Sequence, residues 1–206
     1  MLVPVLLVVA AGAAFWRSVH SARSAPYTIV AATQGSWRVA IATASQPNDP
    51  VLLLEPPSEL SRELFDQVFK RSMESMQGPA FAGMPLVLAS ELERVGSGSI
   101  SPEDLLAMAR AAGLESAPPT PRCMGHRRLP EPNTRSQAFF AIFDSPAFTT
   151  FRSNLATRLG ANFDAAFVTP ALLVGTVESM TQHWLPLHAD AAQDCIAPIV
   201  VVASGP

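Results

Sequence analysis

The sequence predicts an α+β fold, in which a mixed or antiparallel sheet is covered by three or four helices behind an N-terminal hydrophobic helix. Runs of β-branched and aromatic residues alternate along the chain with runs that have helical spacing. Two of the helical runs open with a Ser-Pro pair, a common start of a helix. The chain has 206 residues, 49% of them hydrophobic and 15% charged, which excludes a disordered protein and is enough to bury a core.

The first element is an apolar run at residues 2–16, with Arg17 as the first charge. A membrane-spanning helix needs about 20 apolar residues, and residues 18 and 19 bring the run to a borderline length. We expect an uncleaved, single-pass membrane anchor at residues 2–19. A cleaved secretory signal, which would leave a secreted or periplasmic protein, and a buried core element stay open.

The predicted organisation is therefore an anchor or signal segment at 1–24 and one globular domain at 25–206. The first 48 residues carry Arg17, Arg23 and Arg38 and no carboxylate. Because positive flanks prefer the cytoplasmic side, this pattern weakly favours a cytoplasm-facing domain behind an uncleaved anchor.

Strands are predicted first at residues 27–33 and 37–43, which Gln34-Gly35-Ser36 would join as a hairpin. Four further apolar runs predict strands at residues 51–54, 138–143, 171–177 and 196–203. Within the last of these runs, Pro198 favours an edge position or a strand start.

Helices are predicted where apolar residues recur every three or four positions. The four helical segments are 58–77, 84–95, 101–112 and 145–159, each followed closely by glycine. Ser58, Ser101 and Ser145 are the expected N-terminal caps.

Residues 114–137 are predicted to form a long Pro/Arg-rich loop. Its basic side chains could clamp a phosphate or carboxylate group. The candidate anion-binding residues are Arg122, His126, Arg127, Arg128 and Arg135. The alternative is a solvated loop whose arginines pair with nearby carboxylates.

The chain has two cysteines, Cys123 and Cys195. In an oxidising compartment they would form a disulfide that ties the basic loop to the last strand. Free thiols in a reducing compartment are the second interpretation. A metal site that adds His126 and His183 or His188 is a third and weaker one, because the spacing of a zinc hairpin is missing, so no metal is expected.

Complete catalytic motifs are missing from the sequence. It has no nucleophile elbow, no phosphate-binding loop, no dinucleotide fingerprint and no His-Glu-x-x-His, so no cofactor is expected. The slightly acidic composition, with a formal net charge of -3, excludes a protein that coats nucleic acid. Trp184, between His183 and His188, is either a contact surface or a side chain packed on the sheet.

Residues 138–177 read as a strand, a helix and a strand, and they resemble the second half of the 2H phosphoesterases, the LigT-like superfamily. That resemblance implies a two-lobed α+β fold in which two His-x-Thr/Ser motifs act on phosphoesters. Both motifs are absent here, and Ala171 and Leu173 stand where the family has His and Thr. The resemblance therefore implies a related fold without that activity.

Taken together, these patterns favour a protein without catalytic activity over an enzyme. We expect a membrane-tethered, non-catalytic module that binds a protein partner or a small anionic ligand. The alternative is a hydrolase that acts on phosphoesters or another anionic substrate through the basic residues at 122–135.

Overall fold

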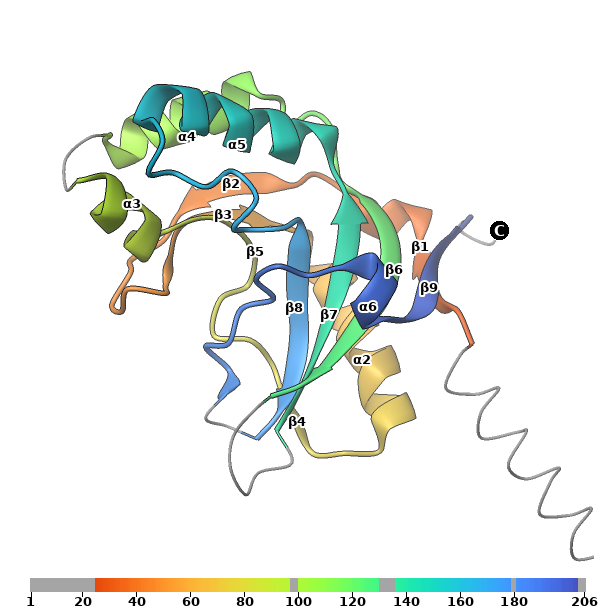
Figure 1. Ribbon diagram of the computed structural model, residues 1–206. Helices are drawn as coiled ribbons and strands as arrows, with labels where there is room; N and C mark the ends of the chain where they lie inside the picture. Colours follow the sequence, from red (N-terminus) through yellow and green to blue (C-terminus); the bar gives the residue numbers. More distant parts are fainter. Residues whose placement is uncertain (1–24, 97–99, 130–135, 179–180, 204–206) are drawn as a thin grey trace, which may run out of the picture.

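The computed structural model describes residues 25–96, 100–129, 136–178 and 181–203 (Figure 1). The predicted anchor or signal segment at 1–24 and the candidate residue Arg135 lie outside these ranges. The described chain is mixed α+β, as the sequence predicts, with strands in two sheets.

The larger sheet is curled and has the strand order β1-β9-β6-β7-β8-β4. Its strands are β1 (Tyr27–Val30), β4 (Met76–Gln77), β6 (Thr120–Arg128), β7 (Gln137–Asp144), β8 (Ala171–Val177) and β9 (Cys195–Val202). Only β1 and β9 run parallel, and the other pairs are antiparallel. The smaller, antiparallel sheet contains β2 (Arg38–Ile41), β3 (Pro50–Glu55) and β5 (Met84–Leu88) in the order β2-β3-β5.

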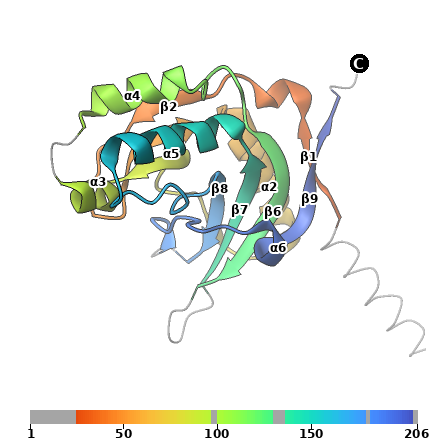
Figure 2. The ribbon, with the colours of Figure 1, turned by 45° about the horizontal axis from the view of Figure 1, so that its top comes forward.

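The described residues contain five α-helices and a short 3-10 helix, η1 (Ala31–Gln34). The α-helices are α2 (Ser58–Ser72), α3 (Ala89–Val95), α4 (Pro102–Ala111), α5 (Pro146–Leu159) and α6 (Ala191–Asp194). The predicted caps of α4 and α5 are confirmed, because Ser101 and Ser145 accept hydrogen bonds from backbone N–H groups three residues on. Figure 2 shows α4 and α5 side by side.

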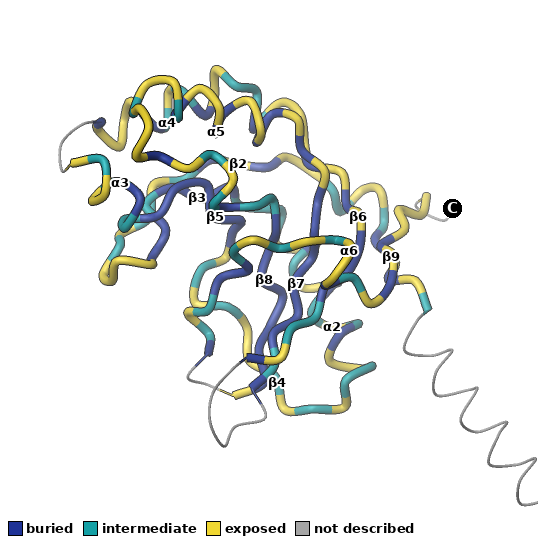
Figure 3. The backbone as a smooth tube through the Cα atoms, in the orientation of Figure 1, coloured by how far each residue is buried: buried dark blue, intermediate teal, exposed yellow. Residues whose placement is uncertain are grey.

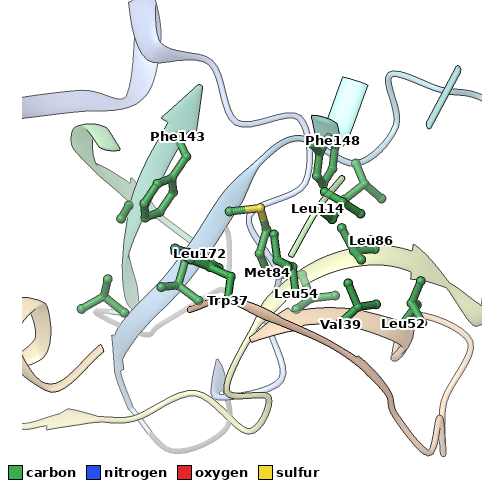
Figure 4. Close-up of a cluster of buried hydrophobic side chains, with 14 of the residues drawn as sticks. Trp37, Val39, Leu52, Leu54, Met84, Leu86, Leu114, Phe143, Phe148 and Leu172 are labelled. Atoms are coloured by element: carbon green, nitrogen blue, oxygen red, sulfur yellow. The ribbon is translucent and has the colours of Figure 1, made fainter. Parts of the chain in front are cut away.

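One hydrophobic core joins the two sheets. Trp37 packs edge-on against Phe143 of the larger sheet, with 5.4 Å between ring centroids. Leu54 and Met84 of the smaller sheet and Leu172 of the larger one belong to the same cluster (Figure 4). Figure 3 shows that much of β3, β5, β7 and β8 is buried.

The predicted N-terminal hairpin is wrong. β1 pairs with β9, with Tyr27 opposite Ile199, whereas β2 pairs with β3. The intervening residues form η1 and end at Gly35, whose φ of +32° favours glycine. The chain thus crosses from one sheet to the other instead of turning back on itself.

Two of the predicted helices differ from the structure. Residues 84–88 form strand β5, so only the second half of the helix predicted at 84–95 is helical. All five residues of β5 are buried, and a short fully buried strand has no period that separates it from a helix. α2 ends at Ser72 rather than near Gly78, because Met73 takes a left-handed conformation with φ of +57°.

The predicted loop at 114–137 is also wrong over most of its basic part. Thr120–Arg128 form strand β6, which pairs with β7 on one side and β9 on the other. Pro121 is accommodated because the register with β7 shifts between Pro121 and Cys123.

Strand β9 does not lie at the edge that Pro198 suggested. It lies between β1 and β6, but its ladder to β6 ends at Pro198 and its ladder to β1 begins at Ile199. The proline therefore stands where the strand changes partner, which explains how an interior strand tolerates it.

Candidate functional site

The larger sheet has one face toward the shared core and an opposite face, which we call the outer face. On β6, β7 and β8 the outer face carries Cys123, Phe140, Ile142, Ala171 and Leu173. Residue Pro198 of β9 pairs with Cys123, so Pro198 and the alternate residues Val200 and Val202 continue the outer face onto β9. Thr28 and Val30 of β1, opposite Val200 and Val202, complete it.

The half of the outer face on β6–β8, the covered half, lies beneath the segment 181–195. Trp184 packs on Phe140 with ring centroids 5.6 Å apart, and it also contacts the cluster of Leu129, Ala138 and Leu173. Of the two interpretations of Trp184, the structure supports packing on the sheet.

An ion pair holds the covering segment to β6. The guanidinium of Arg127 binds Asp194 in two places, Nε to Oδ1 at 3.1 Å and Nη2 to Oδ2 at 2.6 Å. Arg127 also donates to the carbonyl oxygens of Leu187 and His188. The Asp194 side chain is 8% exposed, and its Oδ2 also accepts from the backbone N–H of Asp190. Arg127 therefore fastens this segment and is not free as an anion clamp.

The two cysteines fasten the end of the same segment. Cys123 of β6 and Cys195 at the start of β9 lie at disulfide distance, with Cα atoms 5.8 Å apart. His126, the predicted metal-ligand candidate nearest to Cys123, faces the inner side of β6 next to Phe139. Within the described ranges, no group of three His, Cys, Asp or Glu side chains is placed to hold a metal ion.

The described candidate anion-binding residues do not converge on one site. His126 shares a 2.9 Å hydrogen bond with Gln137, and Arg122 pairs with Asp144 at 3.6 Å on the exposed surface. Arg128 is exposed at the end of β6. Arg127 alone among them is bound into the covered half.

A depression lies near Arg122 at the border of the covered half. Its volume is about 340 Å³, and it is open to solvent. Arg122, Asp144 and Asp190 contribute charged groups, while Thr169 and Ala189–Ala192 form much of the remaining wall. The two carboxylates leave Arg122 as a minority positive charge, so the depression is poorly suited to a strongly anionic ligand.

The most deeply buried ionic pair was missed by the sequence analysis. Arg152 of α5 and Glu91 of α3 are each 1% exposed and are 2.6 Å apart. All five N–H donors of Arg152 have acceptors, which are both Glu91 oxygens and the carbonyl oxygens of Leu86, Asp164 and Ala165. This completeness identifies a structural clamp between β5, α3 and α5, since nothing is left to meet a substrate.

The half of the outer face on β9 and β1, the bare half, lacks a covering segment among the described residues. Val200 and Val202 are 42% and 38% exposed, and Ile196 at the start of the strand is 39% exposed. Residues 24–37 and 195–206, which include both strands, contain no charged side chain. Figure 3 shows β9 turning exposed toward its end.

The free edge of β1 is closed by side chains of α2. Gln67 accepts from the backbone N–H of Thr28 and donates to its carbonyl oxygen, as a neighbouring strand would. Glu63 accepts from the N–H of Val30 and from the hydroxyl of Thr33. The bare half therefore presents an apolar face but not an open strand edge.

No protein-family model, curated protein or solved structure matches this chain. The resemblance to the 2H phosphoesterases accordingly stays a prediction. In the structure, Ala171 and Leu173 lie buried on the covered half, beneath the segment that carries Trp184.

Among the described residues, no helix is long and apolar enough to cross a bilayer.

Proposed function

We propose that this protein is a membrane-tethered, non-catalytic binding module, held to the bilayer by residues 2–19. The observation that carries the proposal is the apolar run at residues 2–16, which no polar side chain interrupts. Strand β1 begins at Tyr27, so the tether and the folded domain are joined by a short connection.

The arrangement of charged groups supports a role without catalysis. A phosphoester hydrolase needs an acid or base that faces the same open space as its arginines. Asp194, the carboxylate beside Arg127, is occupied by that guanidinium and by a backbone N–H. Arg152 and Glu91 are sealed within the core. These pairs support structural roles for the groups that a hydrolase would have used.

The partner in this proposal is a protein or a small anionic ligand. Arg128 is exposed at the end of β6, and Arg135 is the second candidate for such a contact. Exposed arginines of this kind favour carboxylate or phosphate groups on the partner.

Flotation of the full chain tests the tether. After expression in cells, membranes are washed with alkaline carbonate and floated through a density gradient. We expect the protein to float, and the double variant Leu7→Arg and Val8→Arg to be lost from the membrane, because charges in the apolar run oppose insertion. The matched control adds two arginines at exposed α5 positions, Ser153→Arg and Asn154→Arg, and should float.

Two outcomes contradict the proposal. One is a wild-type chain that stays at the bottom of the gradient. The other is an intact mass that lacks the N-terminal segment, which would identify a cleaved signal instead of an anchor.

A further inference from the structure

We infer that the bare half of the outer face lies against the lipid bilayer, so that the domain rests on the membrane surface beside its tether. This inference rests on the proposed function. It specifies which surface of the domain meets the lipid.

The chemistry of the bare half suits an apolar environment. Val200 and Val202 are exposed on β9, and Ile196 at the start of the strand adds further exposed aliphatic surface. Neither strand of the bare half carries a charge, so a bilayer contact there would desolvate no ionised side chain of these strands. Contiguous exposed apolar surface is a known feature of sites that contact proteins or membranes.

The position of the bare half in the chain selects lipid as the occupant. Residues 20–26 connect the predicted anchor to β1, and seven residues span at most about 25 Å. β1 itself forms one strand of the bare half, and β9 pairs with it along Tyr27–Val30. A tether through residues 2–19 would therefore keep β1, and with it the bare half, within about 25 Å of the bilayer.

The start of β1 is fixed by a cation of α2. Arg71 of α2 donates to the carbonyl oxygens of Ala25 and Pro26, the residues through which the chain enters β1. Its guanidinium also lies 3.8 Å from the centroid of the Tyr27 ring. Because Tyr27 faces the core, Arg71 fixes the start of β1 from the side opposite the bare half and places no charge on the bare half.

Closure of the β1 edge argues against pairing with another strand. Gln67 and Glu63 occupy the outward backbone groups of Thr28 and the N–H of Val30. A second copy or a peptide could not extend the sheet through β1 without displacing them. The apolar face is what remains available.

Fluorescence quenching at residue 200 tests the inference. In the oxidised full chain, Val200→Cys would be the single free thiol and can take an environment-sensitive nitrobenzoxadiazole label. The labelled protein is reconstituted in vesicles of phosphatidylcholine and phosphatidylglycerol. We expect quenching by spin-labelled lipid to be several-fold stronger at residue 200 than at the control label, Ser153→Cys on exposed α5, and quenching by aqueous iodide to show the reverse.

The outcomes separate this inference from the proposed function. If the chain floats with the vesicles but residues 200 and 153 are quenched alike, the tether stands and the bilayer contact is wrong. Protection of residue 200 from both quenchers would identify a second copy or a protein partner and would likewise overturn the inference. Failure to float removes the tether and the inference together. Val202→Cys gives a second label on the same face.

Discussion

The covered and bare halves of the outer face belong to one sheet, yet only the covered half is packed beneath another segment of the described chain. On β6–β8 an aromatic side chain, an ion pair and a cysteine pair fasten the segment 181–195 over the strands. On β9 and β1 the same alternation of side chains leads to exposed valines and to no charge at all. The alternation of side chains is thus the same in both halves. An outer-face residue is buried where another segment of the chain has side chains that bind to the sheet.

Removal of the cysteine pair should have the largest effect, because it unfastens the covered half. The double variant Cys123→Ser and Cys195→Ser opens a loop of sequence separation 72. We expect its free energy of unfolding to fall by about 4 kcal/mol in the chain-entropy view of a disulfide. Urea unfolding with and without reductant measures this. Reductant should lower the midpoint of the wild type and leave that of the variant unchanged, and equal midpoints for the two oxidised proteins would contradict the account.

A matched pair of threonine substitutions compares the halves directly. Ile142→Thr places a hydroxyl in the covered half, where Ile142 is 6% exposed, and should cost about 2–3 kcal/mol. Val200→Thr changes an exposed position of the bare half and should stay within about 0.5 kcal/mol. Denaturation of both variants without lipid provides the measurement. Similar losses at the two positions would show that the bare half is buried in the free protein.

The ion pair of the covered half should contribute less. Asp194→Asn weakens the contact with Arg127, whose side chain is 33% exposed, so solvent screening limits the loss to about 2 kcal/mol. The matched control is Asp144→Asn, which breaks an exposed pair with Arg122 and should cost less than about 0.5 kcal/mol. Thermal unfolding of both variants checks the difference. If the Asp194→Asn variant is as stable as its control, Arg127 does not stabilise the position of the segment 181–195.

The smallest expected effect concerns β1 of the bare half, whose Tyr27 faces the core. Tyr27 of β1 is the single tyrosine of the chain. Burial raises the pKa of Tyr27 above its ordinary value of 10.0, and Arg71 offsets part of that rise. The neutral phenol is thus favoured in the folded state. Its contribution to stability is fully present below pH 10.0 and is lost as the pH rises through the raised pKa.

Ultraviolet titration of the phenolate measures this pKa without a variant. Native protein should titrate at higher pH than protein in concentrated urea. Coincident curves would mean that β1 is not docked against the core.

Local signals explain what the sequence predicted correctly. A serine cap followed by proline defines the start of α4 and α5 within a few residues, since both act on the nearest backbone groups. β8 was predicted with its observed bounds, because it is a fully buried apolar run between turn residues. The α+β class follows from such elements taken together.

Pairing between distant segments explains what was missed. Nothing near β1 indicates that it pairs with β9 across the length of the domain. The prolines around β6 indicate a loop. The strand accommodates Pro121 because its register with β7 shifts after this residue, and the basic residues that follow are part of the strand. Among the described candidate site residues, Arg127 has a structural role because it forms an ion pair with Asp194, which is 67 positions away in the sequence.

One missed feature did leave a signal. Arg152 lies four residues after Phe148 and three before Leu155, which places it on the apolar side of α5. A charge at such a position predicts a buried partner. The partner itself, Glu91, could not be named from spacing, because it comes from another helix.

The most direct test of the central claim is photolabelling of the unmodified full chain in vesicles with a lipid-soluble carbene reagent. Cleavage after Asp164, Glu178 and Asp194 separates β8 of the covered half from β9 of the bare half. The account predicts label in residues 195–206 and in the N-terminal segment, and little in residues 165–178. Equal labelling of β8 and β9, or label in the N-terminal segment alone, would contradict it.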